Sequence, residues 1–124
     1  MKEIVSTDAA PAAIGPYSQA IINNQTVYVS GQLPIDPASD QMPGAAADQA
    51  RQSLTNIRHI LESVGSSMDK VLRVGIFMTD LADFQAVNEI YAGFFSGNYP
   101  ARSTVQVAAL PKGAKIEIEA VAEL

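Results

Sequence analysis

The closing segment of the chain, residues 100–120, constrains the fold most, because apolar and polar residues alternate on both sides of a Pro-Lys-Gly turn. Alternation with a period of two indicates β-strands with one apolar face. We therefore expect two strands that pair as a hairpin around the turn. Its apolar face would carry Val105, Val107, Ile116 and Ile118, and its polar face Arg102, Thr104, Gln106, Glu117 and Glu119. A face that places a guanidinium beside carboxylates suits a small charged substrate and a proton transfer.

Two stretches have the apolar spacing of amphipathic helices. Between residues 45 and 64 the apolar residues fall at positions 47, 50, 54, 57, 61 and 64, which lie on one face of a helix. Gly65 follows as a C-terminal cap. Asp80 has the residue type of an N-cap, and we expect a second helix to run from there to Gly97-Asn98. Its apolar stripe consists of Phe84, Val87, Tyr91 and Phe94.

The remaining apolar runs predict strands at residues 2–6, 20–22, 26–30 and 71–78, separated by loops rich in proline and glycine. Right-handed crossovers would make the strands joined by each helix parallel. Two helices cover only one face of a sheet of about six strands, so we expect a two-layer α+β fold with a mixed sheet. The mixed composition of the opposite face predicts that another subunit covers it. That face would carry Tyr28, Ser30, Arg73, Phe77, Arg102, Thr104, Glu117, Glu119 and Val121.

Length and composition limit the class of protein. With 124 residues and 13.1 kDa, the chain is expected to form one domain, residues 1–124. The net charge of −5 and the lack of a basic run disfavour binding to nucleic acid. The absence of cysteine excludes disulfides, thiolate nucleophiles and cysteine metal ligands. No signal peptide or membrane-spanning apolar run is visible, so we expect a cytoplasmic protein.

Four segments, in order along the chain, resemble the reactive-intermediate deaminase family, the enamine/imine deaminases of the RidA/YjgF type. They are Ile14-Gly-Pro-Tyr-Ser-Gln19, Val29-Ser-Gly-Gln32, Pro100-Ala-Arg-Ser103, and Ala109-Leu-Pro-Lys112 followed by Ile116-Glu-Ile-Glu-Ala120. The resemblance covers essentially the full chain. It implies a chorismate-mutase-like fold and a homotrimer with three clefts between subunits. It also implies hydrolysis of 2-imino acids and their enamine tautomers, such as 2-aminoacrylate and 2-aminocrotonate, to 2-keto acids and ammonia, with no metal or organic cofactor.

The resemblance also assigns roles to individual residues. The family's carboxylate-binding arginine falls on Arg102, and its water-positioning glutamate falls on Glu117. Many members have cysteine where this chain has Thr104. If the backbone at this position contacts the substrate, threonine should serve equally well. Any activity that depends on the thiol would be absent. The residues that line the family's cleft fall on Tyr17, Ser30, Gly31 and Asn88.

These residue types suit imine hydrolysis. A bidentate arginine fixes the plane of a carboxylate and orients the neighbouring C=N carbon. Glu117 would take a proton from the attacking water and return it to the leaving nitrogen. Glu119 faces the same side about 6.5–7 Å along the strand, where it would be structural or would tune Glu117. The single histidine, His59, falls on the outer face of its helix and is not expected to act as a base.

Other interpretations of the same residues remain open. Taken alone, Arg102 would more often form an ion pair at an interface, and Glu117 would more often lie on a solvated face. The same cleft could belong to a non-catalytic sensor or regulatory protein that binds 2-keto acids. RNA cleavage has little support, because the chain lacks a basic patch and the paired side chains of phosphodiester chemistry. The preferred substrate is not determined, since the two candidates differ by one methyl group.

Overall fold

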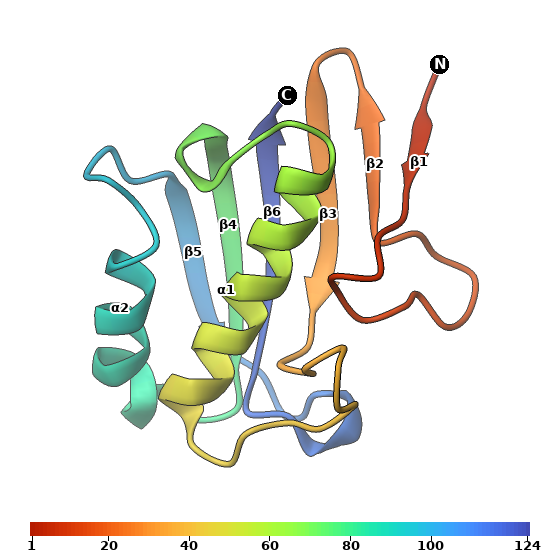
Figure 1. Ribbon diagram of the computed structural model, residues 1–124. Coiled ribbons are helices and arrows are strands. Elements are labelled where there is room, and N and C mark those ends of the chain that lie inside the picture. Colours follow the sequence, from red (N-terminus) through yellow and green to blue (C-terminus); the bar gives the residue numbers. More distant parts are fainter.

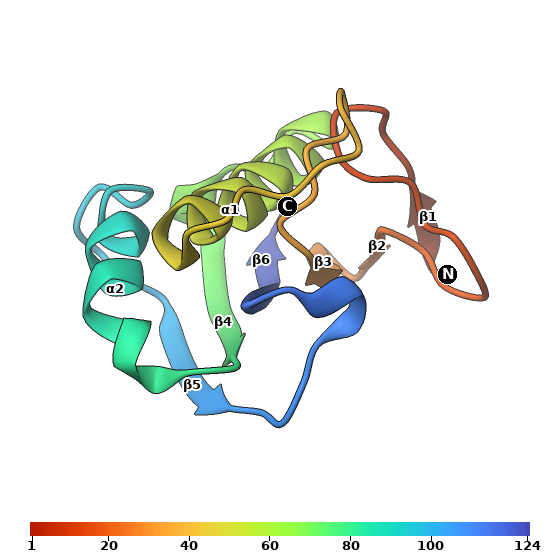
Figure 2. The ribbon, with the colours of Figure 1, turned by 90° about the horizontal axis from the view of Figure 1, so that it is seen from below.

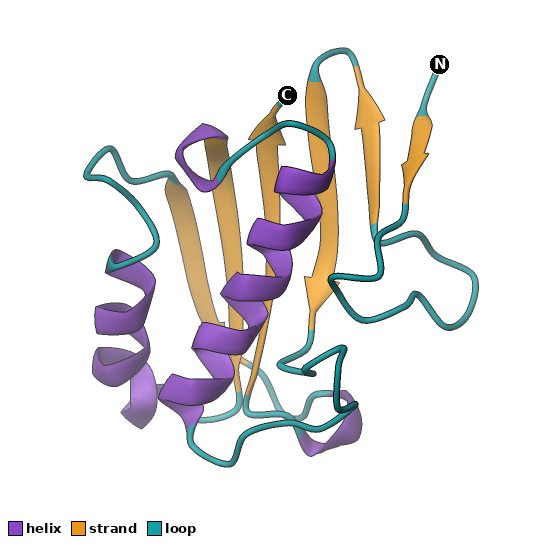
Figure 3. Ribbon diagram, viewed as in Figure 1, coloured by secondary structure: helices purple, strands orange, loops and turns teal.

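A six-stranded mixed sheet forms one layer of the structure, and two helices form the other (Figures 1 and 3). The computed structural model describes all residues, 1–124. The strands are β1 (Glu3–Val5), β2 (Ala20–Asn23), β3 (Thr26–Gln32), β4 (Val71–Met78), β5 (Ala101–Gln106) and β6 (Ile116–Glu123), and the helices are α1 (Ala46–Ser63) and α2 (Phe84–Ala92). The strand order across the sheet is β1-β2-β3-β6-β4-β5. The predicted α+β class, with six strands and two helices, is confirmed.

β6 lies inside the sheet and is antiparallel to both of its neighbours, β3 and β4. β3 and β4 therefore run parallel to each other, and β4 pairs directly with β5 in parallel. The expected closing hairpin is wrong. Both of its strands form where predicted, but β4 lies between them. Residues 107–115 carry the chain past the end of β4, which places β6 between two strands instead of at the edge of the sheet.

α1 packs its apolar side against the sheet, where Leu54, Ile57 and Leu61 are almost fully buried. Its last helical residue is Ser63, and the predicted glycine, Gly65, follows the C-cap Val64. The positive φ of Gly65, +83°, turns the chain so that the Ser66 N–H donates to the Leu61 carbonyl over 2.9 Å. This closure satisfies a carbonyl that the last helical turn would otherwise leave without a partner.

The cap predicted from Asp80 forms, but it starts a 3₁₀ turn before α2 and not α2 itself. The Asp80 Oδ1 accepts a hydrogen bond from the Ala82 N–H over 2.9 Å, at the start of a 3₁₀ turn, Leu81–Asp83, that leads into the helix. The helix ends at Ala92, before the predicted end at Gly97. Its buried side faces α1 and the β4–β5 end of the sheet (Figure 2).

The side chains of β6 alternate between the two faces of the sheet, as the sequence predicts. Ile116 and Ile118 are fully buried in the core between the sheet and the helices. Glu117 and Glu119 alternate with them and point to the face that carries no helix. The alternating pattern of this strand therefore identified its buried side correctly.

The predicted faces of β5 are wrong. Arg102 pairs with Val74 of β4, and Thr104 pairs with Ile76, and both partners are buried beneath the helices. Paired residues on neighbouring strands point to the same face of a sheet. Arg102 and Thr104 therefore lie on the helix side, whereas Val105 lies on the open side and is 45% exposed. β5 has these faces because its register is set by pairing with β4. In that register, apolar residues of this edge strand such as Val105 face the open side of the sheet.

The opposite face of the sheet carries no helix (Figure 2). It holds apolar side chains beside charged ones, among them Tyr28, which is 51% exposed, and Glu119. Such a mixed surface is unusual for a face that remains in contact with water. That another subunit covers this face of the sheet remains a prediction.

Candidate active site

Arg102 reaches from β5 toward α2, where Asn88 holds it. Its Nη1 donates a hydrogen bond to the Asn88 Oδ1 over 2.7 Å. A guanidinium has five N–H donors, so the others remain available for a bound molecule. The structure thus brings together two residues that the sequence resemblance had assigned to one cleft.

A pocket of about 400 Å³ opens beside this guanidinium. Arg102 and Thr104 line it together with Leu81 and Phe84. The Thr104 Oγ1 is buried and has no hydrogen-bond partner. Two apolar side chains beside a guanidinium and a hydroxyl match the needs of a small carboxylate with an apolar side chain.

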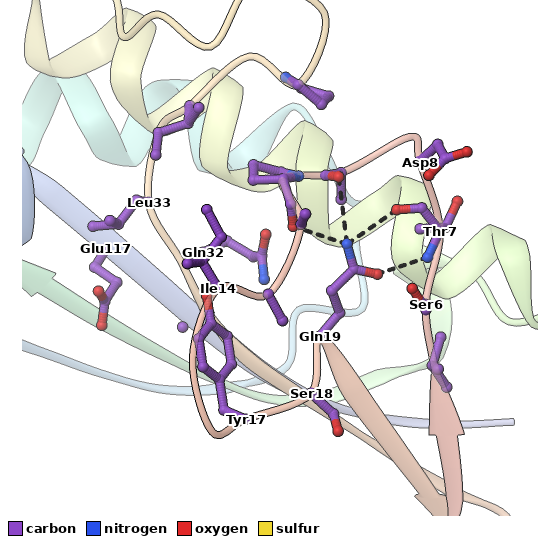
Figure 4. Close-up of a pocket in the computed structure, with 18 of the residues that line it drawn as sticks. Ser6, Thr7, Asp8, Ile14, Tyr17, Ser18, Gln19, Gln32, Leu33 and Glu117 are labelled. Carbon is purple, nitrogen blue, oxygen red and sulfur yellow. Dashed lines mark hydrogen bonds between the residues drawn. The ribbon is translucent and has the colours of Figure 1, made fainter.

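Glu117 lies on the opposite face of the sheet, in a depression of about 1060 Å³ (Figure 4). Tyr17 and Gly31 line the same depression. Burial raises the pKa of the Glu117 carboxyl above its ordinary value, and the charge of Glu119 raises it further. A carboxylate with a raised pKa is a stronger base near neutral pH, which suits proton transfer.

The position of the Glu117 side chain requires glycine at residue 31. A Cβ added to Gly31 would lie 2.6 Å from the Glu117 Oε2, closer than real Cβ atoms approach other atoms. Gly75 has a similar relation to Glu119, whose Cγ would lie 3.0 Å from an added Cβ. The two glycines allow both carboxylate side chains to lie back against the sheet.

Gln19 anchors the loop that carries Tyr17 (Figure 4). The Gln19 Oε1 accepts a hydrogen bond from the Thr7 N–H over 2.7 Å. Its Nε2 donates to the carbonyls of Thr7, Ala10 and Pro11 over 3.0, 3.3 and 2.8 Å. The sequence shows only a glutamine before a strand, so this role was missed. Its one visible signal is that Gln19 belongs to the segment that carries the family resemblance.

Ser30 fixes the other end of this loop. Its Oγ donates to the Ser18 carbonyl over 2.6 Å, and its N–H donates to the Gln19 carbonyl over 2.9 Å. The hydroxyl of Ser30 is therefore engaged in holding the loop next to Tyr17. Of the predicted Ser30-Gly31 pair, Gly31 is the residue that lines the depression around Glu117.

The predicted site residues thus form two groups on opposite faces of the sheet. The first, which we call the arginine group, consists of Arg102, Asn88 and Thr104. The second, the glutamate group, consists of Glu117, Tyr17 and Gly31. Within one copy of the chain the sheet separates the two groups. Neither group alone combines a carboxylate-binding cation with a base.

The structure contains no group of three or more histidine, aspartate or glutamate side chains arranged to hold a metal ion. Neither helix has the length and apolar character needed to cross a membrane.

Comparison with known proteins identifies the family. The endoribonuclease L-PSP family matches residues 7–124. A Bos taurus protein named 2-iminobutanoate/2-iminopropanoate deaminase is 50% identical over 123 residues, which covers 98% of this chain and 90% of the relative. The chain therefore belongs to the endoribonuclease L-PSP family, and its resemblance to RidA/YjgF-type deaminases is confirmed.

Solved structures of relatives have the same fold. The structure of Escherichia coli TdcF with bound serine has a TM-score of 0.95 and 43% identity, and the match covers 98% of each chain. RidA from the Antarctic bacterium Psychrobacter has a TM-score of 0.95 and 44% identity, over 98% of this chain and 99% of the relative. The predicted fold is confirmed by these similarities.

Proposed function

We propose that this protein is a hydrolytic deaminase that converts 2-imino acids, and their enamine tautomers, to 2-keto acids and ammonia. The observation that carries the proposal is the guanidinium of Arg102, which Asn88 holds beside a partly apolar pocket while its other donors remain available. The name of the Bos taurus relative supports the substrate class, because 2-iminobutanoate and 2-iminopropanoate are small 2-imino acids with apolar side chains.

In the proposed reaction, Arg102 binds the substrate carboxylate with two N–H donors and orients the C=N carbon. Glu117 accepts a proton as a water oxygen bonds to that carbon, and the C=N electron pair moves to nitrogen. Glu117 then donates this proton to the nitrogen, which gives a carbinolamine. It next accepts the hydroxyl proton of the carbinolamine and passes it to the nitrogen as the C–N bond breaks and the carbonyl forms. The products are a 2-keto acid and ammonia. Imines hydrolyse without a catalyst, so positioning and one proton shuttle are sufficient.

We also propose that two copies of the chain complete each site, in a homotrimer with three equivalent clefts. The arginine group of one subunit would face the glutamate group of its neighbour. The separation of Arg102 from Glu117 by the sheet supports this arrangement, because both are needed and one copy does not bring them together. The uncovered face that carries Glu117 supports it as well, since a neighbouring subunit would bury the exposed side chains of Tyr28 and Val105.

Mixing two inactive variants tests the shared site. Arg102→Ala and Glu117→Gln trimers, unfolded together and refolded at equal concentration, are expected to regain about one quarter of wild-type activity. In random trimers, about one site in four combines an intact Arg102 with an intact Glu117 from different subunits. If both residues acted from the same subunit, the mixture would stay as inactive as its components, and the shared site would be wrong.

Gly31→Ala is expected to lower kcat/KM by about tenfold or more. The added Cβ would displace the Glu117 carboxylate, and a misplacement of about 1 Å can cost roughly 100-fold in rate. Gly44→Ala is the matched control, because a Cβ at Gly44 meets no atom within 4 Å. Steady-state kinetics and melting temperatures should be compared for both variants. Equal activity in the two would contradict the assigned position of Glu117.

The direct test of the proposed function is a coupled assay. A threonine dehydratase generates the imine, semicarbazide traps the part that escapes hydrolysis, and semicarbazone formation is followed by absorbance. Wild-type protein at substoichiometric concentration is expected to reduce semicarbazone formation, and Arg102→Ala is expected to restore it. If wild-type protein in its assembled form has no effect, the chain is not a deaminase of this class.

A second function, the binding of small amino-acid-like ligands without turnover, has one observation in its favour. The E. coli relative TdcF was solved with bound serine. A sensor would bind a 2-keto acid saturably in calorimetry and would leave the rate of imine hydrolysis unchanged. Rate enhancement at substoichiometric protein would exclude binding as the sole function.

We further propose that the protein acts in the cytoplasm on small molecules and not on RNA, although its family is described as an endoribonuclease. The net charge of −5 supports this, because a phosphate backbone is bound mainly by lysine and arginine. Highly purified protein is expected to leave RNA intact. RNA degradation that disappears in Arg102→Ala would contradict the proposal.

A further inference from the structure

We infer that Phe84 and Tyr91 are positioning residues that hold the guanidinium of Arg102 in the orientation that binds a carboxylate. The inference deepens the proposed function and rests on it, because it concerns how Arg102 is prepared to bind the substrate. Neither aromatic residue is expected to touch the reacting atoms.

The two rings and Asn88 lie on one face of α2. Phe84, Asn88 and Tyr91 follow each other at intervals of four and three residues, which places neighbouring members about one helical turn apart. The Arg102 Cζ lies 4.7 Å from the centroid of the Tyr91 ring and 5.4 Å from that of Phe84. Both distances are within the range of cation–π attraction. Three residues of one helix thus contact a single guanidinium that comes from β5.

The ring of Tyr91 is itself rigidly placed. Tyr91 is 4% exposed, and its ring packs against Phe95 with centroids 4.9 Å apart. The Tyr91 hydroxyl is buried and has no hydrogen-bond partner, so the contact with Arg102 comes from the ring. Burial raises the pKa of this hydroxyl, and the charge of Arg102 lowers it by a smaller amount. The side chain therefore acts as a neutral aromatic surface beside the cation.

Holding the guanidinium in this way has a consequence for binding. A free arginine side chain samples many rotamers, and ordering it upon binding weakens affinity. The contacts with Phe84 and Tyr91, together with the Asn88 hydrogen bond, order the side chain before a ligand arrives. They also leave N–H donors of Arg102 uncommitted beside the pocket. An ordered and partly desolvated guanidinium binds a carboxylate in the bidentate manner more strongly.

Phe84→Leu and a matched control test the role of the first ring. Phe94 lies 5.4 Å from Arg58, the same distance that separates Phe84 from Arg102, and both phenylalanines are partly buried. Phe84→Leu is expected to raise KM for the imino acid roughly 2- to 30-fold, which corresponds to the loss of one cation–π contact. Phe94→Leu removes the same kind of contact from a different arginine and is expected to leave KM unchanged. Equal KM values in the two variants would overturn the inference for Phe84.

Variants of Tyr91 distinguish an effect on the position of Arg102 from the loss of a direct contact with substrate, because Tyr91 does not line the pocket beside Arg102. Tyr91→Leu is expected to raise KM over the same range as Phe84→Leu. Tyr91→Phe keeps the ring and removes only an unpaired hydroxyl, so it is expected to return KM to near the wild-type value. If Tyr91→Leu does not fold, the comparison between Phe84→Leu and Phe94→Leu still decides whether the Phe84 ring contributes to substrate binding.

Binding of 2-ketobutyrate, measured by calorimetry on the assembled protein, gives a readout independent of turnover. Phe84→Leu and Tyr91→Leu are expected to weaken this binding by the same factor by which they raise KM, while kcat and its pH profile change little. A change in kcat or in the pH profile with unchanged 2-ketobutyrate binding would overturn the inference. The wild-type protein distinguishes failure of the inference from failure of the proposed function. If it binds 2-ketobutyrate but does not accelerate hydrolysis, the proposed deaminase activity fails, and the 2-ketobutyrate affinities of the variants still decide whether Phe84 and Tyr91 position Arg102. If it does not bind 2-ketobutyrate, the inference fails as well.

Discussion

Arg102→Ala is expected to lower kcat/KM for 2-imino acids roughly 100- to 10,000-fold. Two charge-assisted hydrogen bonds to the carboxylate would be lost, each worth about 1.5–3 kcal/mol. Within one copy of the chain, no other cation lines the pocket that Arg102 shares with Leu81, Phe84 and Thr104. The measurement is steady-state kinetics in the coupled assay, with 2-ketobutyrate affinity as a second readout.

Arg102→Lys is the informative companion of the alanine variant. Lysine keeps the charge but lacks the planar fork that binds both carboxylate oxygens and spreads over the rings of Phe84 and Tyr91. We expect an activity between those of wild type and Arg102→Ala. Melting temperature and oligomer size must be recorded for each variant, because Asn88 loses its hydrogen-bond donor. Activity of Arg102→Ala within about threefold of wild type, against the roughly 100-fold loss expected from the hydrogen bonds, would remove Arg102 from the site.

Glu117→Gln is expected to lower kcat roughly 100- to 10,000-fold, the usual contribution of general acid–base catalysis, and to change KM little. Glutamine has nearly the same shape, so the fit against Gly31 is kept while the ability to accept a proton is lost. Because burial and Glu119 raise the pKa of Glu117, a larger protonated fraction is present at mildly acidic pH than for an ordinary glutamate. Unchanged kcat in Glu117→Gln would exclude this residue as the base.

The same pKa shift predicts the acidic side of the pH profile. Glu117 must be ionised to accept a proton, so kcat/KM should rise with pH through a midpoint above the ordinary pKa of glutamate. Glu119→Gln removes a negative charge that raises this pKa, and the midpoint should therefore move to lower pH while the plateau is kept. A midpoint that stays in place or moves to higher pH would show that Glu119 does not tune Glu117.

Much of the candidate site could be predicted from the sequence. Arg102 and Glu117 stand in segments with a specific family resemblance, and the alternation of β6 placed Glu117 on the correct face. The role of Phe84 and Tyr91 could not be predicted, although both belong to the recognised apolar stripe of α2. Aromatic residues at helical spacing usually pack in a core, and only the packing of α2 beside β5 shows that these two contact an arginine.

By itself, the sequence determined the features that depend on neighbours along the chain. These are the periods of the helices and strands, the cap at Asp80, the turn at Gly65 and the buried side of β6. The tertiary structure alone decided which strands pair and which face Arg102 occupies. Backbone donors and acceptors are the same in every strand, so alternation does not specify a partner, and a strand pairs where its burial with distant elements is most favourable. The insertion of β4 between β5 and β6, together with the register of Arg102 against Val74, placed Arg102 and Glu117 on opposite faces of one sheet.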